Sequence, residues 1–303
     1  MKRKLIYLGL FLLFSLTIWY FLIKKSDYTI TFTAKTSSGT VYQGINEWML
    51  NLQKSEQCKV KSLTHTKFKL IDYFVDKGEE SFYYSWSLSP ISDSTTKVIL
   101  DIKSQNNSFY HRFSAPFFST EFKEYHINQI KEFRAGLEKH LEKFKVKIEG
   151  IGQTEELFVA YITLNSVQQE KAQKMIFHDP EITGYLAKNK IEIIGKPYLE
   201  ILNWDVESEQ LTFNYCFPIQ KNTPYVADEK VKFKTIPPIN GLKATYFGNY
   251  RTSDRAWFAL LDYAERNTIQ LKLNPLENFL ANPFYGGDEL SWETKIIIPI
   301  VKE

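Results

Sequence analysis

The chain has 303 residues, of which 44% are hydrophobic, 24% are charged and 16% are aromatic. This composition is close to that of an average globular protein and excludes a chain that is mainly disordered or fibrous. The length allows two domains, at about 100–200 residues per domain. A formal net charge of +3 does not indicate the basic patch that nucleic-acid binding requires. The only two cysteines, Cys58 and Cys216, exclude a disulfide framework and a cysteine-rich zinc site.

The N-terminus carries a long run of uncharged residues. Nineteen residues, Leu5–Ile23, lie between the basic segment Lys2–Lys4 and the pair Lys24 and Lys25. As a helix this run would span about 28 Å, close to the ~30 Å hydrocarbon core of a bilayer. It is longer than the apolar region of a signal peptide, and no A-x-A-like cleavage site follows it. We therefore predict a single-pass membrane anchor over residues 1–25. The basic residues narrowly favour a periplasmic or other extracytoplasmic location for the rest of the chain.

The sequence pattern of residues 27–148 predicts a first domain of the α+β class. The segment Thr29–Ala34 alternates with the period of a strand, and Ser81–Ser89 does so most clearly. Residues 121–144 carry one continuous apolar stripe at helical spacing. Several strands followed by a long amphipathic helix indicate an antiparallel sheet with the helix laid across it. The other expected elements are a helix at 40–53 and strands at 67–75, 97–102 and 109–113.

Aromatic side chains of this first part allow two interpretations. Phe82, Tyr84 and Trp86 share one face of the expected strand, so they either line a ligand cavity or pack beneath the long helix. His126 lies on the apolar stripe of that helix, and we expect it to be a packed core histidine.

Residues 152–303 repeat one order of elements, strand–helix–strand–strand, twice. Both copies close on an apolar residue followed by proline and isoleucine, with the prolines at Pro218 and Pro299. Proline fits the end of a strand because it cannot donate a hydrogen bond to the ladder. Two such units commonly form one sheet with a cleft between the halves, and the domain boundary is predicted near Gly150. The expected elements are strands at 156–165 and 241–250, helices ending near 189 and 266, and strand pairs ending at 219 and 300.

Four segments of this second part carry a resemblance to a known family. They are Lys243–Tyr250, the helix with Trp257, Phe279 ahead of Asn282 and Pro283, and Trp292–Pro299. With these segments, residues 152–303 resemble a GyrI-like (effector-binding, SOUL-related) domain, the ligand module of many multidrug-sensing regulators. The resemblance implies the duplicated fold and a ligand cleft between its halves.

The first part resembles an SRPBCC (START-like, polyketide-cyclase-type) domain. The resemblance is carried by the opening strand Ile30–Ala34, the segment Asn46–Trp48 and the long closing helix. An anchor followed by these two domains also resembles a set of uncharacterised bacterial membrane-attached proteins. The predicted fold class is therefore α+β, with one transmembrane helix, a helix-grip antiparallel sheet with a long C-terminal helix at 27–148, and a GyrI-like domain at 152–303.

The GyrI-like resemblance also implies ligand-binding residues. The closing strand of this family carries a buried glutamate after its threonine, which attracts cations or assists hydrolysis. Here Lys295 stands at that place, Asn214 stands at the counterpart in the first repeat, and Glu293 shares a strand face with Lys295. The aromatic residues in the elements that line the family's cleft are Trp204, Tyr250, Trp257 and Phe279.

For Trp257 and Lys295, the sequence modifies what the family resemblance implies. Trp257 shares a helix stripe with three small or apolar residues, which favours a core position over ligand contact. Lys295 predicts that the cleft binds apolar or anionic molecules rather than lipophilic cations. Either an unpaired ammonium or a neutral pair of Lys295 with Glu293 would remove the attraction for a cation.

The predicted function is that of a membrane-anchored protein that binds or senses a small apolar or amphipathic ligand without catalysis. The sequence contains no HExxH zinc motif and no glycine-rich nucleotide loop, so no metal and no cofactor are predicted. Nucleic acid is not an expected partner, and a protein partner stays unspecified. One alternative is a hydrolase in the GyrI-like cleft, with Tyr250 as acid or orienting hydroxyl and Glu293 activating water. Another is a scaffold that binds an envelope protein.

Overall fold

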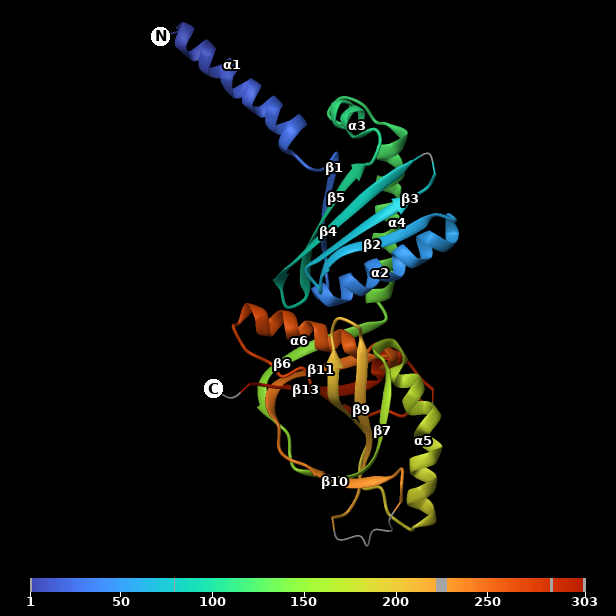
Figure 1. Cartoon of the computed structure of the whole chain (residues 1–303). Helices are drawn as coiled ribbons and strands as arrows, with labels where there is room; N and C mark the ends of the chain where they lie inside the picture. Colours follow the sequence, from blue (N-terminus) through green and yellow to red (C-terminus); the bar gives the residue numbers. More distant parts are fainter. Residues whose placement is uncertain (1, 79, 222–227, 284–285, 302–303) are drawn as a thin grey trace. The chain divides into compact units, whose positions relative to one another are not determined.

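The computed structural model describes residues 2–78, 80–221, 228–283 and 286–301 (Figure 1). The chain divides into two compact units, each built on one antiparallel sheet. Unit 1 comprises Met1–Ala34, Val41–Ser89 and Thr96–Leu137. Unit 2 comprises Lys35–Thr40, Pro90–Thr95 and Glu138–Glu303.

The chain begins with helix α1, Lys2–Ile18, which is followed by a π-helical segment, Trp19–Ile23. The predicted transmembrane helix is wrong, and so is the membrane localisation that rested on it. In the described part of the chain, no helix is both long enough and apolar enough to cross a bilayer. The physical reason is that the α-helix holds only 17 residues, which rise about 26 Å, and its first turn is basic. Met1 of the predicted anchor lies outside the described residues.

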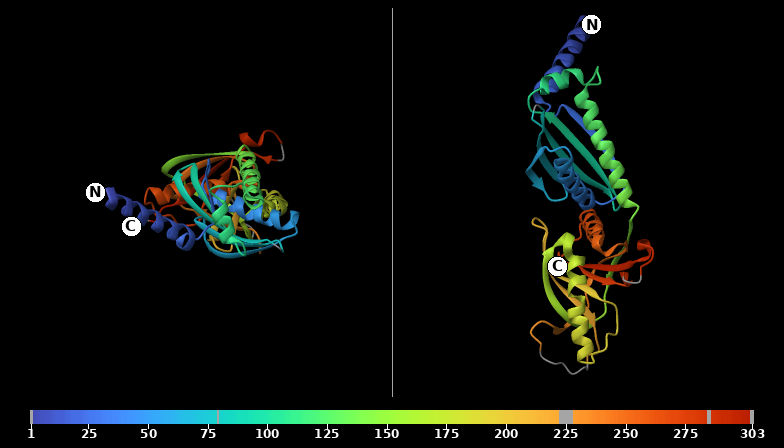
Figure 2. Two further views of the ribbon diagram at one scale, coloured as in Figure 1. Left: turned by 90° about the horizontal axis from the view of Figure 1, so that it is seen from above. Right: turned by 90° about the vertical axis from the view of Figure 1, so that its right-hand side faces the viewer.

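Unit 1 is a five-stranded sheet in the order β1-β5-β4-β3-β2. Helix α4 runs along this sheet, as Figures 1 and 2 show. The strands are β1 Tyr28–Ala34, β2 Lys59–Thr66, β3 Leu70–Asp76, β4 Ser81–Ser92 and β5 Thr95–Ser104. The helices are α2 Ser38–Ser55, α3 Ser108–Ser114 and α4 Glu121–Leu141.

Two expectations for unit 1 need correction. The segment predicted as a strand at 109–113 is helix α3, and strand β2 was not expected. In α3 the side chains of His111 and Arg112 are buried, and the Arg112 guanidinium contacts the Asp27 carboxylate at 2.8 Å. This contact is made to a residue far away in the chain, so it outweighs the strand preference of the aromatic residues in the segment.

The face of the sheet beneath α4 is filled by aromatic side chains. Phe82, Tyr84 and Trp86 of β4 are at most 1% exposed. Trp86 lies against Phe133 of α4, and Phe82 lies against His126 with 4.6 Å between the ring centroids. These residues therefore pack beneath the helix, as the second interpretation of the sequence expected.

Unit 2 is an eight-stranded sheet in the order β10-β7-β9-β8-β12-β13-β11-β6, and every pairing is antiparallel. The elements β7-α5-β8-β9 and β11-α6-β12-β13 repeat one order, and the two halves meet where β8 pairs with β12. The strands are β6 Phe144–Gln153, β7 Leu157–Val167, β8 Tyr198–Asp205, β9 Gln210–Pro218, β10 Lys232–Ile236, β11 Asn240–Gly248, β12 Leu276–Phe279 and β13 Glu293–Pro299. The helices are α5 Lys171–Lys188 and α6 Asp254–Arg266.

Strand β6 crosses the position at which the sequence predicts the domain boundary. Gly150 lies inside β6, opposite Lys243 of β11, at a register shift between the two strands. Its φ of +87° is a left-handed conformation that glycine adopts without strain. The limits 27–148 and 152–303 stay predictions, to be tested by expressing the fragments.

Helices α5 and α6 cover one face of this sheet, called the helix face below. Helix α5 contacts β7, and helix α6 contacts β11 and β13. Glu277 of β12 faces α6, because its carboxylate accepts a hydrogen bond from the Trp257 indole. Side chains alternate along a strand, so Leu276 and Asn278 point to the opposite face, called the open face.

Candidate functional site

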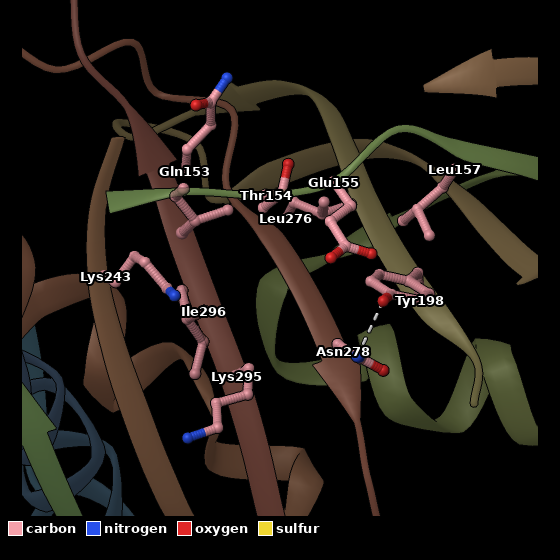
Figure 3. Close-up of a pocket in the computed structure, with 11 residues that line it drawn as sticks. Gln153, Thr154, Glu155, Leu157, Tyr198, Lys243, Leu276, Asn278, Lys295 and Ile296 are labelled. Carbon is pink, nitrogen blue, oxygen red and sulfur yellow. Dashed lines mark hydrogen bonds between the residues drawn. The ribbon is translucent and has the colours of Figure 1, made fainter. Parts of the chain in front are cut away.

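A cavity of about 240 Å³ lies on the open face, where the two halves of the sheet meet (Figure 3). Its apolar lining comes from Leu157, Leu276 and Ile297. Polar side chains stand around this lining, and they come from strands of both halves and from the segment between β6 and β7. They belong to Gln153, Thr154, Glu155, Tyr198, Lys243, Asn278 and Lys295.

Lys295, which the sequence predicts as a ligand-binding residue, lines this cavity with its charge already compensated. Its ammonium lies 2.8 Å from the Glu293 carboxylate and 3.2 Å from the Glu149 carboxylate. It also donates a hydrogen bond to the Thr245 hydroxyl at 2.9 Å. The hydrogen bond to Glu293 is the main reason why the pKa of Lys295 is raised. Lys295 therefore stays charged and is paired with Glu293.

Lys243 is the other cation of the cavity, and its position depends on a glycine. A Cβ at Gly152 would lie 2.7 Å from the Lys243 Cδ, so the glycine leaves room for the lysine stem. Figure 3 shows the Lys243 ammonium beside Ile296, on the same side of the cavity as Lys295. Among the residues that the structure describes, no carboxylate lies within the 4.0 Å of an ion pair with Lys243.

Tyr198 and Asn278 face these lysines across the cavity (Figure 3). The Asn278 Nδ2 donates to the Tyr198 hydroxyl at 2.9 Å, so the phenol oxygen acts as acceptor and its own O–H stays free to donate. Burial, and to a lesser extent the charge of Glu155, raises the pKa of Tyr198. The phenol therefore remains protonated at neutral pH and offers a donor to a ligand.

Asn214 and Glu293 lie on the open face outside the lining of this cavity. The Asn214 Nδ2 donates to Glu200 at 2.7 Å, and its oxygen accepts from Thr163 at 2.8 Å. Lys234 pairs with the same Glu200. The predicted residue Asn214 is thus engaged in a separate polar cluster.

Tyr250 and Phe279 line a different cavity, of about 550 Å³, on the helix face. Their ring centroids are 4.7 Å apart. The seven predicted ligand residues are therefore divided between the two faces of the sheet rather than gathered in one cleft.

Trp204 and Trp257 belong to the core beneath α6. Their ring centroids are 5.0 Å apart, and Trp257 is completely buried. The Trp257 Nε1 donates to the Glu277 carboxylate at 2.6 Å, which occupies its polar atom. The core interpretation of Trp257 fits this position.

Glu277 is a buried carboxylate that the sequence argument missed. It is fully buried on the helix face and also accepts a hydrogen bond from the Ser253 hydroxyl at 2.9 Å. Burial raises its pKa to about 7, and the charge of the buried Lys171 opposes that shift. The sequence does carry a signal for this residue: Glu277 lies two residues before Phe279, so the two share a strand face.

Three residues of the open-face cavity were also missed as site residues: Tyr198, Lys243 and Asn278. Each is a polar residue within a strand whose sequence neighbours are largely buried. A polar residue between buried neighbours in a strand indicates a side chain that faces a polar cavity instead of the core. Lys243 also belongs to the segment Lys243–Tyr250, which carries the family resemblance.

The sequence matches no known protein family and no curated protein. Several solved structures are similar to about half of the chain. The C-terminal domain of EcmrR is 16% identical, covers 53% of this chain and 99% of its own, and has a TM-score of 0.44. SAV2435, solved with bound tetraphenylphosphonium, is 12% identical, with coverages of 51% and 94% and a TM-score of 0.36. A putative transcription regulation protein from Staphylococcus aureus MU50 is 13% identical, with coverages of 52% and 99% and a TM-score of 0.36.

With such low scores, the function is inferred below from the geometry of this chain alone. The SRPBCC resemblance of the first part stays a prediction.

Proposed function

We propose that this protein binds a small amphipathic organic anion, such as a carboxylate, in the open-face cavity. The observation that carries the proposal is the Lys243 ammonium, which stands without a carboxylate partner among the described residues beside an apolar lining. Typical ligand sites combine apolar walls with a few placed polar groups, in volumes of about 300–1,000 Å³. At about 240 Å³, this cavity lies just below that range and suits only a small ligand.

One cation of the cavity is available to an anion. Lys295 is paired with Glu149 and Glu293, whereas Lys243 forms no ion pair with a carboxylate of the described residues and acts on Glu149 only at longer range. The Tyr198 hydroxyl supplies a neutral donor on the opposite side. Glu155 is exposed at the rim, where water and salt screen its charge. Lys243 is half-buried, so its attraction for a carboxylate is screened less.

The hydrolase alternative is less well supported because its two residues do not share a site. The Tyr250 hydroxyl donates to the backbone oxygen of Ala281 at 3.0 Å and accepts from the Ala281 N–H at 2.8 Å on the helix face. The Glu293 carboxylate is paired with Lys295, which lines the open-face cavity. A water activated by Glu293 would therefore not meet the Tyr250 hydroxyl.

Titration of the full chain with two matched probes tests the proposal. Benzoate and benzylammonium have similar apolar bodies and opposite charges, and their binding is measured by calorimetry. We expect benzoate to bind more tightly than benzylammonium. Lys243→Met should weaken benzoate at least about tenfold, because a charge-assisted hydrogen bond contributes about 1.5–3 kcal/mol.

The matched control is Lys145→Met, which removes an exposed lysine of β6 that lines neither cavity. It should leave the affinity for benzoate unchanged. Tighter binding of benzylammonium, or equal effects of the two lysine substitutions, would refute an anion site at Lys243.

A further inference from the structure

Two adjacent rows of side chains cross the open face where the halves of the sheet meet. Cross-strand pairing joins the first row, which is polar and consists of Tyr198, Asn278, Lys295 and Thr245. The second row lies two residues away along the strands and consists of Leu276, Ile297 and Lys243. Residues two apart in a strand share a face, so both rows point to the same side of the sheet. The second row therefore gives the open-face cavity an apolar floor that ends at Lys243.

Tyr198 and Lys243 lie at opposite corners of this double row. Their strands, β8 and β11, are separated by β12 and β13. Three strand spacings, about 14 Å, therefore lie between the two backbones. Figure 3 shows the Tyr198 hydroxyl and the Lys243 ammonium on opposite sides of the cavity. A ligand that contacts both groups must carry its polar atoms at opposite ends of its body.

The Tyr198 hydroxyl is a fixed donor without an acceptor. It accepts a hydrogen bond from Asn278 Nδ2 at 2.9 Å, and no described residue accepts its own proton. The Tyr198 ring packs against the buried cluster that contains Leu276 and Ile297, which holds the phenol in place. The Asn278 Oδ1 atom is buried and has no partner among the described residues, so a ligand meets the phenol proton instead.

An unpaired donor of this kind discriminates between ligands. A ligand that removes water from the phenol without supplying an acceptor leaves the donor unsatisfied, which costs affinity. The charge of Glu155 acts on this end of the cavity, where it adds to the effect of burial in raising the pKa of Tyr198. A neutral acceptor therefore fits here better than a second carboxylate.

We propose that Tyr198 determines the specificity of the open-face cavity, and that the ligand is a carboxylate with a neutral hydrogen-bond acceptor, such as a carbonyl oxygen, at its far end. The carboxylate contacts Lys243, the apolar body lies over Leu276 and Ile297, and the carbonyl accepts the Tyr198 proton. This proposal rests on the anion site at Lys243 and adds the class of acid, an oxo acid in place of a simple hydrocarbon acid.

The test compares 4-acetylbenzoate with 4-isopropenylbenzoate, which have nearly the same shape and differ by a carbonyl oxygen in place of a methylene group. In calorimetric titration of the full chain, 4-acetylbenzoate should bind about three- to tenfold more tightly, the effect of one neutral hydrogen bond. Tyr198→Phe keeps the ring and should abolish this preference by weakening 4-acetylbenzoate alone. The matched control is Tyr161→Phe, because Tyr161 is also half-buried against the same cluster and lies outside the lining.

The outcomes separate this proposal from the anion site on which it rests. Lys243→Met should weaken both benzoates equally and leave their ratio unchanged. Lys243-dependent binding without a preference for the acetyl compound, or a preference that survives Tyr198→Phe, would overturn the role of Tyr198 and leave the anion site standing. Binding of both compounds that does not respond to Lys243→Met would overturn the anion site and this proposal together.

Discussion

In unit 1, the aromatic residues of β4 fill the space between the sheet and α4, and Trp86 is completely buried. In unit 2, aromatic residues of β9 and β12 surround a cavity of about 550 Å³ beneath α5. Both sheets therefore place aromatic side chains under a helix, but the space is filled in unit 1 and left as a cavity in unit 2. The difference teaches that aromatic content by itself does not distinguish a packed core from a ligand site. What decides is whether the facing helix supplies enough side-chain volume to fill the space.

The helices explain this difference. Helix α4 presents Phe122, His126 and Phe133 to the aromatic residues of β4, so the rings of the helix pack directly against the rings of the strand. Helix α5 presents Ala172, Met175 and Ile176 to its cavity, and these side chains leave space.

The units also differ in how burial affects an ionisable group. His126 in unit 1 has its pKa lowered to about 3, mainly by burial. Glu277 in unit 2 has its pKa raised to about 7, also mainly by burial. Burial disfavours the charged form in both cases, and the consequences for stability run in opposite directions with pH.

The largest effect is expected from truncating a packed aromatic residue. Trp86→Ala should lower the free energy of unfolding by about 3–5 kcal/mol, because it leaves a large hole in a filled core. Trp292→Ala, at the existing cavity of unit 2, should cost much less. Urea denaturation followed by circular dichroism measures both. Trp86→Phe is the control, since it keeps a ring and removes an indole N–H that has no hydrogen-bond partner in the described part of the chain. Equal losses for the two alanine variants would contradict the comparison.

The next effect concerns Glu277. Its pKa is about 7 in the folded state and 4.5 in the reference state, so the folded protein binds more protons between these values. The contribution of Glu277 to stability should therefore fall as the pH rises from about 4.5 to about 7, by up to about 3 kcal/mol. Glu277→Gln keeps the size, so this contribution is measured as the difference between the unfolding free energies of the wild type and the variant, in urea from pH 5 to pH 8. A difference that does not change with pH would contradict the prediction.

His126 should show the opposite dependence. Its folded-state pKa is about 3 against a reference value of 6.5, so the unfolded state binds more protons in this window. The contribution of His126 to stability should fall as the pH drops below 6.5, by about 2 kcal/mol at pH 5. Its Nδ1 lies 2.7 Å from the Tyr84 hydroxyl, and His126→Gln retains a polar group there. In the same pH series, the difference in unfolding free energy between the wild type and this variant should change by that amount between pH 7 and pH 5, and a constant difference would count against the assignment.

The smallest effect is expected at Lys295. Its side chain is 41% exposed, and its pairs with Glu149 and Glu293 are near the surface. Exposed pairs contribute about 0–1 kcal/mol, so Lys295→Met should change stability by no more than this. Benzoate affinity should change much less than in Lys243→Met. A tenfold loss on Lys295→Met would make Lys295 the anion-binding residue instead.

Much of unit 2 could be predicted from local patterns in the sequence. The strands predicted at 156–165 and 241–250 correspond to β7 and β11, and the repeated order of elements is present in both halves. Strands β6 and β10 were missed. Each pairs with one strand at an edge of the sheet, and such pairing depends on a partner far away in the chain rather than on the segment's own pattern.

The candidate site was predicted less well. The sequence placed Lys295 and Glu293 on one strand face, and the structure pairs them at 2.8 Å. It also grouped Tyr250 and Phe279 with them, but these rings line the helix-face cavity. Alternation along a strand determines which residues share a face. It does not reveal which of the two faces the helices cover.

The sequence by itself determined the amphipathic helix α4, the alternating strands and the duplicated order of elements, because these depend on periodicity within short segments. Only the tertiary structure decided that the uncharged N-terminal run is not one long α-helix, that Glu277 is buried beside Trp257 and that the two cavities lie on opposite faces. The physical reason is that burial, charge compensation and cavity volume depend on side chains brought together from distant segments. Local periodicity carries no information about contacts between residues that are distant in the sequence.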